Sequence, residues 1–309
     1  MTHKARSGGV LLFAGAALLA AGLLNARPLP AETPAVTLTV TAVGKKDNPP
    51  PAVKRDDVQF YVNKEQTQLA DWRKGDTLFL AVLIDDSLDS NIASQWPDLR
   101  AFMMAQPAST HIAVAYIRNG AAMVAQDFTS DHALAAKALR IPLGNAGAFT
   151  SPYLALQDWV KRWPDSNERK SILLISSGVD YFRGAYDTVD PDVDTAIEQA
   201  QKKNINIWTI YSTDAGHRAR RNYEVFLAQG FLSRVSGDTG AESFYIGFGP
   251  PVSLKPYLDE LQTHLNNQYL LSFVANGGAK GNFEHVRVHT ELPKTEFFSA
   301  PQAYIPATK

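Results

Sequence analysis

Acidic and hydroxyl side chains directly follow an apolar run in the stretch "FLAVLIDDSLDSN". Residues 78–84 contain no polar side chain, which is typical of a strand covered on both faces, as in a parallel sheet between helices. Ligands of such sheets gather at the carboxyl ends of the strands. We therefore expect Asp85, Ser87 and Asp89 to lie at a binding edge of the sheet.

Two further segments place hydroxyl groups where they could join this edge. Thr150 precedes a helical segment, and Ser177 follows the apolar run "ILLI" by two positions. Oxygen atoms from separate loops are the ligands that a hard cation such as Mg²⁺ requires, with Mn²⁺ or Ca²⁺ as alternatives. The sequence thus predicts that a cation site could form from oxygen-bearing side chains of three loops: Asp85, Ser87, Asp89 and Ser90, then Thr150 and Ser151, then Ser176 and Ser177. The alternative is that these side chains only cap loops and helices.

The elements that must position these residues alternate along the chain. From residue 78 onward, apolar strands alternate with helical patterns, which predicts a doubly wound, mainly parallel α/β sheet flanked by helices. Ser151 before Pro152, and Asp190 before Pro191, are typical of capped helix starts. The leucine stripe in "LKPYLDELQTHLNNQ" predicts a last helix over residues 254–268.

Both ends of the chain have strand character. The segment "VTLTVTAV" alternates strictly, as a half-buried strand does, and a hairpin is expected to turn near Asn63 and Lys64. We expect residues 32–75 and 270–309 to form one small β module beside the domain at 76–269, with "VTLTVTAV" paired to "HVRVHT".

The N-terminus is typical of an exported protein. Lys4 and Arg6 precede an apolar stretch that is short for a membrane span, and small residues follow at Ala26 and Ala31. We interpret residues 1–31 as a secretory signal peptide and the protein as periplasmic or secreted; an uncleaved membrane anchor is the alternative. After cleavage no membrane span is expected.

Composition excludes several classes of function. The chain has no cysteine, which excludes disulfides, thiolate metal sites and a thiol nucleophile. Its net charge of -1 becomes more acidic when residues 1–31 are removed, so nucleic acid is not an expected partner. The chain contains no G-x-S-x-G, H-E-x-x-H, P-loop or dinucleotide-binding motif after the first strand, so we do not expect an enzyme.

The motifs resemble those of von Willebrand factor type A domains. The metal-ion-dependent adhesion site of that family is written D-x-S-x-S, then a threonine, then an aspartate before glycine; "DDSLD", "FTSPYLAL" and "LLISSGVD" are similar in order and spacing. Asp89 stands where the family has its second serine, and Ser177 where it has the last aspartate. The whole chain after residue 31 resembles exported bacterial proteins of the acidobacterial VWFA-related type, through "VKRDDVQFYVNKEQTQL" and "LNNQYLLSFVANGGAKGNFEHVRVH".

The resemblance implies an adhesion or interaction module. In that scheme Ser87 and Thr150 offer hydroxyl oxygens to the cation, Asp85 supplies charge, Asp89 compensates for Ser177, and the ion accepts an acidic side chain from a protein partner. The alternatives are a metal-free scaffold module of the same fold and a cation-dependent hydrolase.

Three other motifs are interpreted as structural. Asp190, Asp192 and Asp194 are spaced like calcium ligands, but the glycine and glutamate of such a loop are missing, and acids suit a first helical turn. "HVRVH" (residues 285–289) is expected to be a solvated strand face rather than a zinc site, and "HRARR" (residues 217–221) an exposed loop.

Overall fold

The computed structural model describes residues 35–45, 50, 52–145, 150–164, 166–183, 188–216, 222–245, 253–275 and 280–307. Glu32–Lys309 form one compact unit. The expected signal peptide and the basic loop "HRARR" lie outside the described residues. Within the described part of the chain, no helix has both the length and the apolar character needed to cross a membrane.

The central sheet has six strands. Five are parallel, and the sixth, β7, pairs antiparallel with β6 through a turn at Asn119 and Gly120, which both have positive φ as a tight hairpin requires. The strand order across the sheet is β10 (Ser243–Tyr245), β9 (Ile205–Tyr211), β8 (Arg169–Ser176), β5 (Leu78–Asp85), β6 (Thr110–Arg118) and β7 (Ala121–Thr129).

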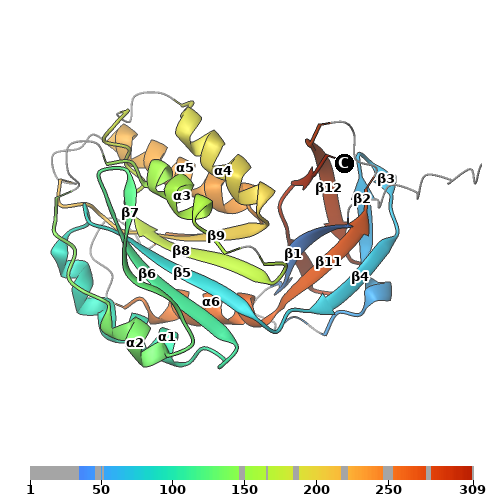
Figure 1. The fold of residues 1–309 in the computed structure, drawn as a ribbon, viewed down its shortest axis with the longest axis horizontal. Coiled ribbons are helices and arrows are strands. Elements are labelled where there is room, and N and C mark those ends of the chain that lie inside the picture. The colour runs from blue at the N-terminus through green and yellow to red at the C-terminus, as the bar shows by residue number, and fades with distance from the viewer. Residues whose placement is uncertain are drawn as a thin grey trace, which may run out of the picture. The chain divides into compact units, whose positions relative to one another are not determined.

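Helices cover both faces of this sheet (Figure 1). One face packs against α1 (Trp96–Met104), α2 (His132–Lys137) and α6 (Lys255–Asn266), and the other against α3 (Pro152–Lys161), α4 (Pro191–Lys202) and α5 (Asn222–Asp238). Strand β5 supplies Leu80 and Val82 to the first core, and Ala81 and Leu83 to the second. The predicted doubly wound α/β class is confirmed, and its physical basis is this two-sided burial.

The helices begin where the sequence indicates. The Ser151 hydroxyl accepts the N–H of Leu154 at 3.3 Å and caps α3, while the Asp190 carboxylate accepts the N–H of Asp192 at 2.8 Å and caps α4. The predicted last helix is α6, with Leu258, Leu261 and Leu265 buried. These caps fix where the loops at the carboxyl edge of the sheet end.

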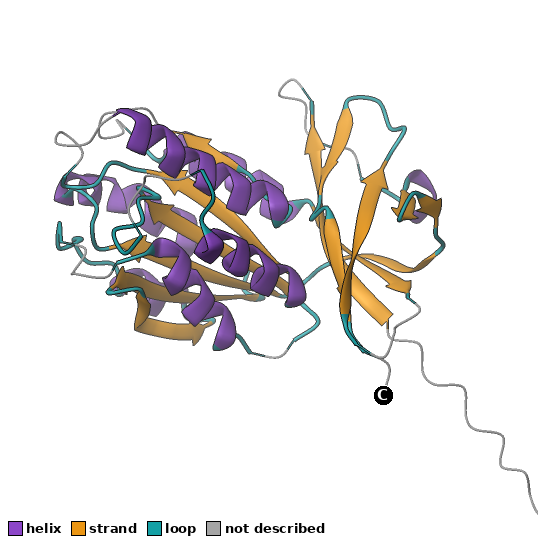
Figure 2. Cartoon of the chain, turned by 90° about the horizontal axis from the view of Figure 1, so that it is seen from above, coloured by secondary structure: helices purple, strands orange, loops and turns teal. Residues whose placement is uncertain are grey.

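Strands from both chain ends form two further antiparallel sheets, which are almost helix-free in Figure 2. The first has the order β13 (Thr295–Phe298), β1 (Ala35–Gly44), β11 (Gln268–Val274) and β4 (Leu69–Lys74). The second has the order β14 (Gln302–Ile305), β12 (Asn282–His289), β2 (Gln59–Val62) and β3 (Glu65–Gln66). The expected hairpin is confirmed, with Asn63 and Lys64 at positive φ between β2 and β3.

The expected partner of the first strand was wrong. Strand β1 pairs with β11 and β13, whereas "HVRVH" in β12 pairs with β2 and β14. The reason is apolar matching: Leu38 and Val40 of β1 share a core with Leu271 and Phe273 of β11. A polar strand face could not replace that contact.

The threonine face of β1 also differs from the expectation of a half-buried strand. Thr39 and Thr41 are almost fully buried, and the backbone N–H of Thr39 donates to the side-chain oxygen of Asn204 at 2.8 Å. Asn204 lies two residues after the end of α4, so β1 contacts the α/β domain, and it is buried on both faces.

Candidate functional site

Asp85 is the last residue of β5 and is fully buried. One carboxylate oxygen accepts the backbone N–H of Ser87 at 2.9 Å, and the other accepts the Ser176 hydroxyl at 2.7 Å. Burial raises the pKa of Asp85, the hydrogen bonds from Ser176 and Ser87 oppose that rise, and the nearby charge of Asp214 adds to it. The carboxylate is held by neutral donors and carries no ion pair among the described residues.

Ser87 has a buried hydroxyl beside this carboxylate. Its side-chain oxygen makes no hydrogen bond of ordinary geometry with any residue that the structure describes. A buried polar atom without a partner costs free energy, so such atoms commonly mark places for an ion or water. Its lone pairs could serve a cation at this position.

Thr150 and Ser177 lie at the same edge and are nearly fully buried. The Thr150 hydroxyl accepts the N–H of Asn119 at 3.0 Å, and the Ser177 hydroxyl lies 3.4 Å from the backbone nitrogen of Val179. Neither contact uses all the acceptor capacity of a hydroxyl. Both oxygens therefore keep lone pairs that a hard cation could use.

Asp214 joins these loops, and sequence analysis did not identify it. It is buried, and its backbone forms an isolated antiparallel β-bridge with Leu88. Its carboxylate accepts a hydrogen bond from the Tyr181 hydroxyl at 2.8 Å, and the backbone N–H of Tyr181 donates to the Thr150 carbonyl at 2.8 Å. These contacts connect the Ser87 loop to the Thr150 loop. The signal in the sequence is that "STD" directly follows the apolar run of β9, at the same edge.

Asp89 has a local role in the structure. Its carboxylate accepts the N–H of Asn91 at 2.9 Å and caps the short helix η2 (Ser90–Gln95), and the residue is only partly buried. Asp89 thus lies at the partly exposed border of the site, whereas the second buried carboxylate close to Asp85 belongs to Asp214.

Asp86 is neutralised by a partner far along the chain. Both oxygens accept from the Arg140 guanidinium at 2.7 Å, and that guanidinium lies 3.6 Å from the centre of the Tyr116 ring. The bidentate pair satisfies the buried carboxylate. Asp86 therefore has a structural role: it holds residues 140–143 at the carboxyl edge of the central sheet.

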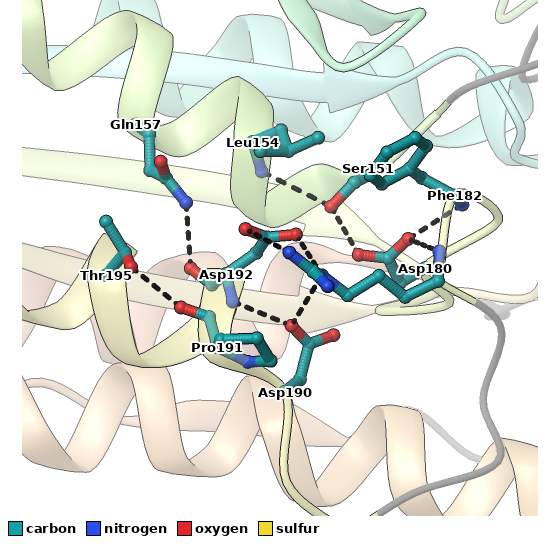
Figure 3. A network of polar contacts seen from close by, with 10 residues as sticks. Ser151, Leu154, Gln157, Asp180, Phe182, Asp190, Pro191, Asp192 and Thr195 are labelled. Atoms are coloured by element: carbon teal, nitrogen blue, oxygen red, sulfur yellow. Dashed lines mark hydrogen bonds and ion pairs between the residues drawn. The ribbon is translucent and has the colours of Figure 1, made fainter.

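Asp180, Asp190 and Asp192 form an acidic cluster at the starts of α3 and α4 (Figure 3). The positive charge in this cluster is the guanidinium of Arg183. Asp180 accepts the Ser151 hydroxyl at 2.6 Å and the N–H groups of Phe182 and Arg183, and Arg183 pairs with Asp192 and, at 3.9 Å, with Asp190. This network clamps the loop after β8 onto the starts of α3 and α4. The prediction that Asp190 caps a helix, with Asp192 and Asp194 in its first turn, is confirmed.

The strand-face prediction for β12 is also confirmed. His285, Arg287 and His289 are exposed, and Val286 between them is buried. These two histidines therefore lie on a solvated face.

Several exposed apolar side chains belong to the loops and helix ends at the edge that carries the site. They come from segments that begin or end at the carboxyl edge of the sheet and are 45% to 62% exposed: Ile141, Leu143, Phe182, Val189, Tyr223, Phe226 and Tyr245. Clusters of exposed apolar residues on soluble proteins are typical of protein-binding surfaces. We refer to these seven residues as the apolar rim.

The fold and the edge define a class: a doubly wound α/β domain with a buried carboxylate and hydroxyls at the carboxyl ends of its strands. No protein-family model matches the sequence, and no curated protein matches it either. The chain is similar to solved structures that include von Willebrand factor type A domains.

Three of these structures are as follows. A von Willebrand factor type A protein from Catenulispora acidiphila is 10% identical, with a TM-score of 0.47 over 88% of this chain and 73% of that one. An aerotolerance-related membrane protein from Bacteroides fragilis is 12% identical, with a TM-score of 0.45 over 61% of this chain and 98% of that one. The SpRpn10 VWA domain is 12% identical, with a TM-score of 0.41 over 62% and 98%.

Proposed function

We propose that this chain is an exported protein-interaction module that binds a protein partner at the carboxyl edge of its central sheet. The observation that carries the proposal is the buried Ser87 hydroxyl, which lies beside the buried Asp85 carboxylate and makes no hydrogen bond of ordinary geometry among the described residues. Exposed apolar side chains near a polar, oxygen-lined centre are typical of a surface that binds another protein. Export rests on the interpretation of residues 1–31.

The centre of this interface would hold Mg²⁺, or Mn²⁺ or Ca²⁺ in its place. Asp85, Ser87, Thr150 and Ser177 would hold the ion, with Asp214 as the second buried negative charge. All donors are oxygens, as these cations prefer. When bound, the ion would offer a coordination position to a carboxylate of the partner.

The first test is thermal unfolding of the full chain in EDTA and then in millimolar Mg²⁺. A ligand at about a hundred times its dissociation constant stabilises the folded state by roughly 2.7 kcal/mol, which raises the midpoint by several degrees. We expect this rise in the unmodified protein and in an Asp127→Ala control, whose side chain is exposed. We expect none in Ser87→Ala, which removes a hydroxyl that makes no hydrogen bond of ordinary geometry among the described residues and so keeps the fold.

An equal rise in Ser87→Ala and in Asp85→Ala would place the cation elsewhere. No rise in any protein would favour the second candidate, a metal-free interaction module that binds through the apolar rim.

Partner binding is tested by selection of displayed random peptides on the full chain. If the ion accepts a carboxylate, the recovered peptides carry an acidic residue, are released by EDTA and are not recovered by Ser87→Ala. Peptides that bind equally in EDTA and are lost only in Leu143→Asp, a change in the apolar rim, would support the metal-free module instead.

We do not propose catalysis. Chromogenic phosphate and acyl esters test the cation-dependent hydrolase directly: turnover that requires Mg²⁺ and disappears in Asp85→Ala would replace the interaction proposal with an enzyme.

A further inference from the structure

His264, on α6, is a buried histidine with one ring nitrogen facing carboxylates. Its side chain is 5% exposed, and its ring stacks on Trp208 at 5.2 Å and meets the edge of Phe298 at 5.8 Å. These aromatic contacts fix the orientation of the imidazole. Its Nδ1 atom has no hydrogen-bond partner among the described residues.

Two glutamates lie close to this imidazole ring. Glu260 lies one helical turn before His264 on α6, and Glu242 directly precedes β10. One side-chain ligand atom from each of the three residues lies within 4.8 Å of the other two. Nδ1 is 3.8 Å from a Glu242 carboxylate oxygen, too long for a hydrogen bond and wide enough for an ion between them.

The charges of these carboxylates are not compensated within the described chain. Neither Glu242 nor Glu260 forms an ion pair there with lysine or arginine, and Glu296 of β13 adds a third negative charge nearby. Glu296 itself pairs with Lys45 at 3.6 Å. The acidic cluster at Asp192 differs in this respect, because the Arg183 guanidinium there forms an ion pair with a carboxylate.

The protonation tendencies agree with this geometry. Burial, with the charges of Glu260 and Glu296 in second place, raises the pKa of Glu242 to about 7. Burial lowers the pKa of His264 to about 4, so its imidazole is neutral at pH 7, the form that binds metals. A bound cation would relieve the crowding of negative charge.

We propose that His264, Glu242 and Glu260 form a second metal site, which binds a divalent transition metal and by its donor set Zn²⁺. One imidazole nitrogen with two carboxylate oxygens suits Zn²⁺, whereas Mg²⁺ and Ca²⁺ prefer oxygen alone. The site lies beside β10, an edge strand, whereas Asp85 is on β5, separated from it by β9 and β8. It joins α6 to the end of the segment that precedes β10, and its three ligands leave a fourth position open for water or for Glu296.

The test uses the full chain without a histidine tag, stripped with a chelator and titrated with Zn²⁺ against a chromogenic chelator. The chain has no cysteine to compete for the metal. We expect one equivalent bound at micromolar or tighter affinity, and an affinity at least tenfold weaker in His264→Gln and in Glu260→Gln. Glu260 is exposed, so its variant keeps the fold even if His264→Gln does not.

Two matched controls locate the metal. The double variant His285→Gln and His289→Gln, on the solvated face of β12, and Asp127→Ala, at an exposed position on β7, are both expected to bind Zn²⁺ as the unmodified chain does. Unchanged affinity in both His264→Gln and Glu260→Gln, or loss of binding in the β12 variant, would overturn the proposal. Failure of Mg²⁺ to act at Ser87 would leave it standing, because the two sites share no ligand.

Discussion

At the scale of single residues, two adjacent acids at the end of β5 have different environments. Asp86 is 1% exposed and held by the Arg140 guanidinium, whereas Asp85 is held by the neutral donors of Ser87 and Ser176. Of the two, only Asp85 has no ion-pair partner among the described residues, so only its carboxylate is available to a cation. The stability of the edge should accordingly depend on Arg140, and its binding on Asp85 and Ser87.

Replacing Arg140 by methionine should destabilise the fold by roughly 2 kcal/mol, because it leaves the buried Asp86 carboxylate without its cation. The value is at the low end for a buried pair because Arg140 is 43% exposed. Urea unfolding followed by circular dichroism measures the change. Arg118→Met, at an exposed position on β6, is the control and should differ from the unmodified protein by less than about 0.5 kcal/mol. Equal midpoints for the two variants would show that the pair contributes nothing.

At the scale of elements, the loop after β8 is positioned by one glycine against α5. Gly178 has φ +70°, and a Cβ there would lie 2.6 Å from the Ala228 carbonyl oxygen and 2.8 Å from Leu232 Cγ. Tyr153 on α3 also donates its hydroxyl to the Gly178 carbonyl at 2.8 Å. The glycine therefore allows α3 and α5 to approach the loop that carries Ser177.

Gly178→Ala should destabilise the chain by about 2 to 4 kcal/mol, through positive φ and overpacking together. Gly230→Ala, within α5 itself, should have the opposite sign: no atom lies within 4 Å of its added methyl group, and alanine favours a helix by about 0.5 to 1 kcal/mol. Unfolding midpoints of the two variants on either side of the unmodified protein would confirm the pair of predictions. Destabilisation by both would mean that α5 tolerates no change.

At the scale of the whole molecule, the chain closes on itself because strands from its two ends share sheets. Thr37 on β1 lies opposite Ser272 on β11, with their hydroxyl oxygens 3.0 Å apart. These residues are separated by 235 positions in the sequence. The β module therefore cannot form before most of the chain has been made.

A disulfide between Thr37→Cys and Ser272→Cys should form in high yield on oxidation, because no other cysteine competes. It should raise the unfolding midpoint, with at most roughly 5 kcal/mol from the long loop that it closes. Non-reducing electrophoresis and thermal unfolding measure both effects. Thr37→Cys with Arg287→Cys, which tests the strand pairing that the sequence suggested, should stay reduced. A cross-link in this second pair would contradict the observed register.

What could be predicted from the sequence is local in origin. The apolar run of residues 78–84 predicted a buried parallel strand, Ser151 before Pro152 predicted a helix start, and Asn63 with Lys64 predicted a hairpin turn. Each depends on periodicity or on contacts within about four residues, which a sequence records directly. The position of Asp85 and Ser87 at a strand end follows from the same information.

The tertiary structure decided which distant residues meet. It brought Asp214 to the Ser87 loop, Arg140 to Asp86, β11 to β1, and Glu242 to His264, none of which a local pattern contains. The physical reason is that these contacts are selected by how whole faces bury their apolar area and by which charges are left without water. The buried apolar area and the desolvation of charges are defined only once the helices and sheets have packed. Local sequence patterns therefore determine each strand and helix cap, whereas the tertiary structure determines which of them contact one another.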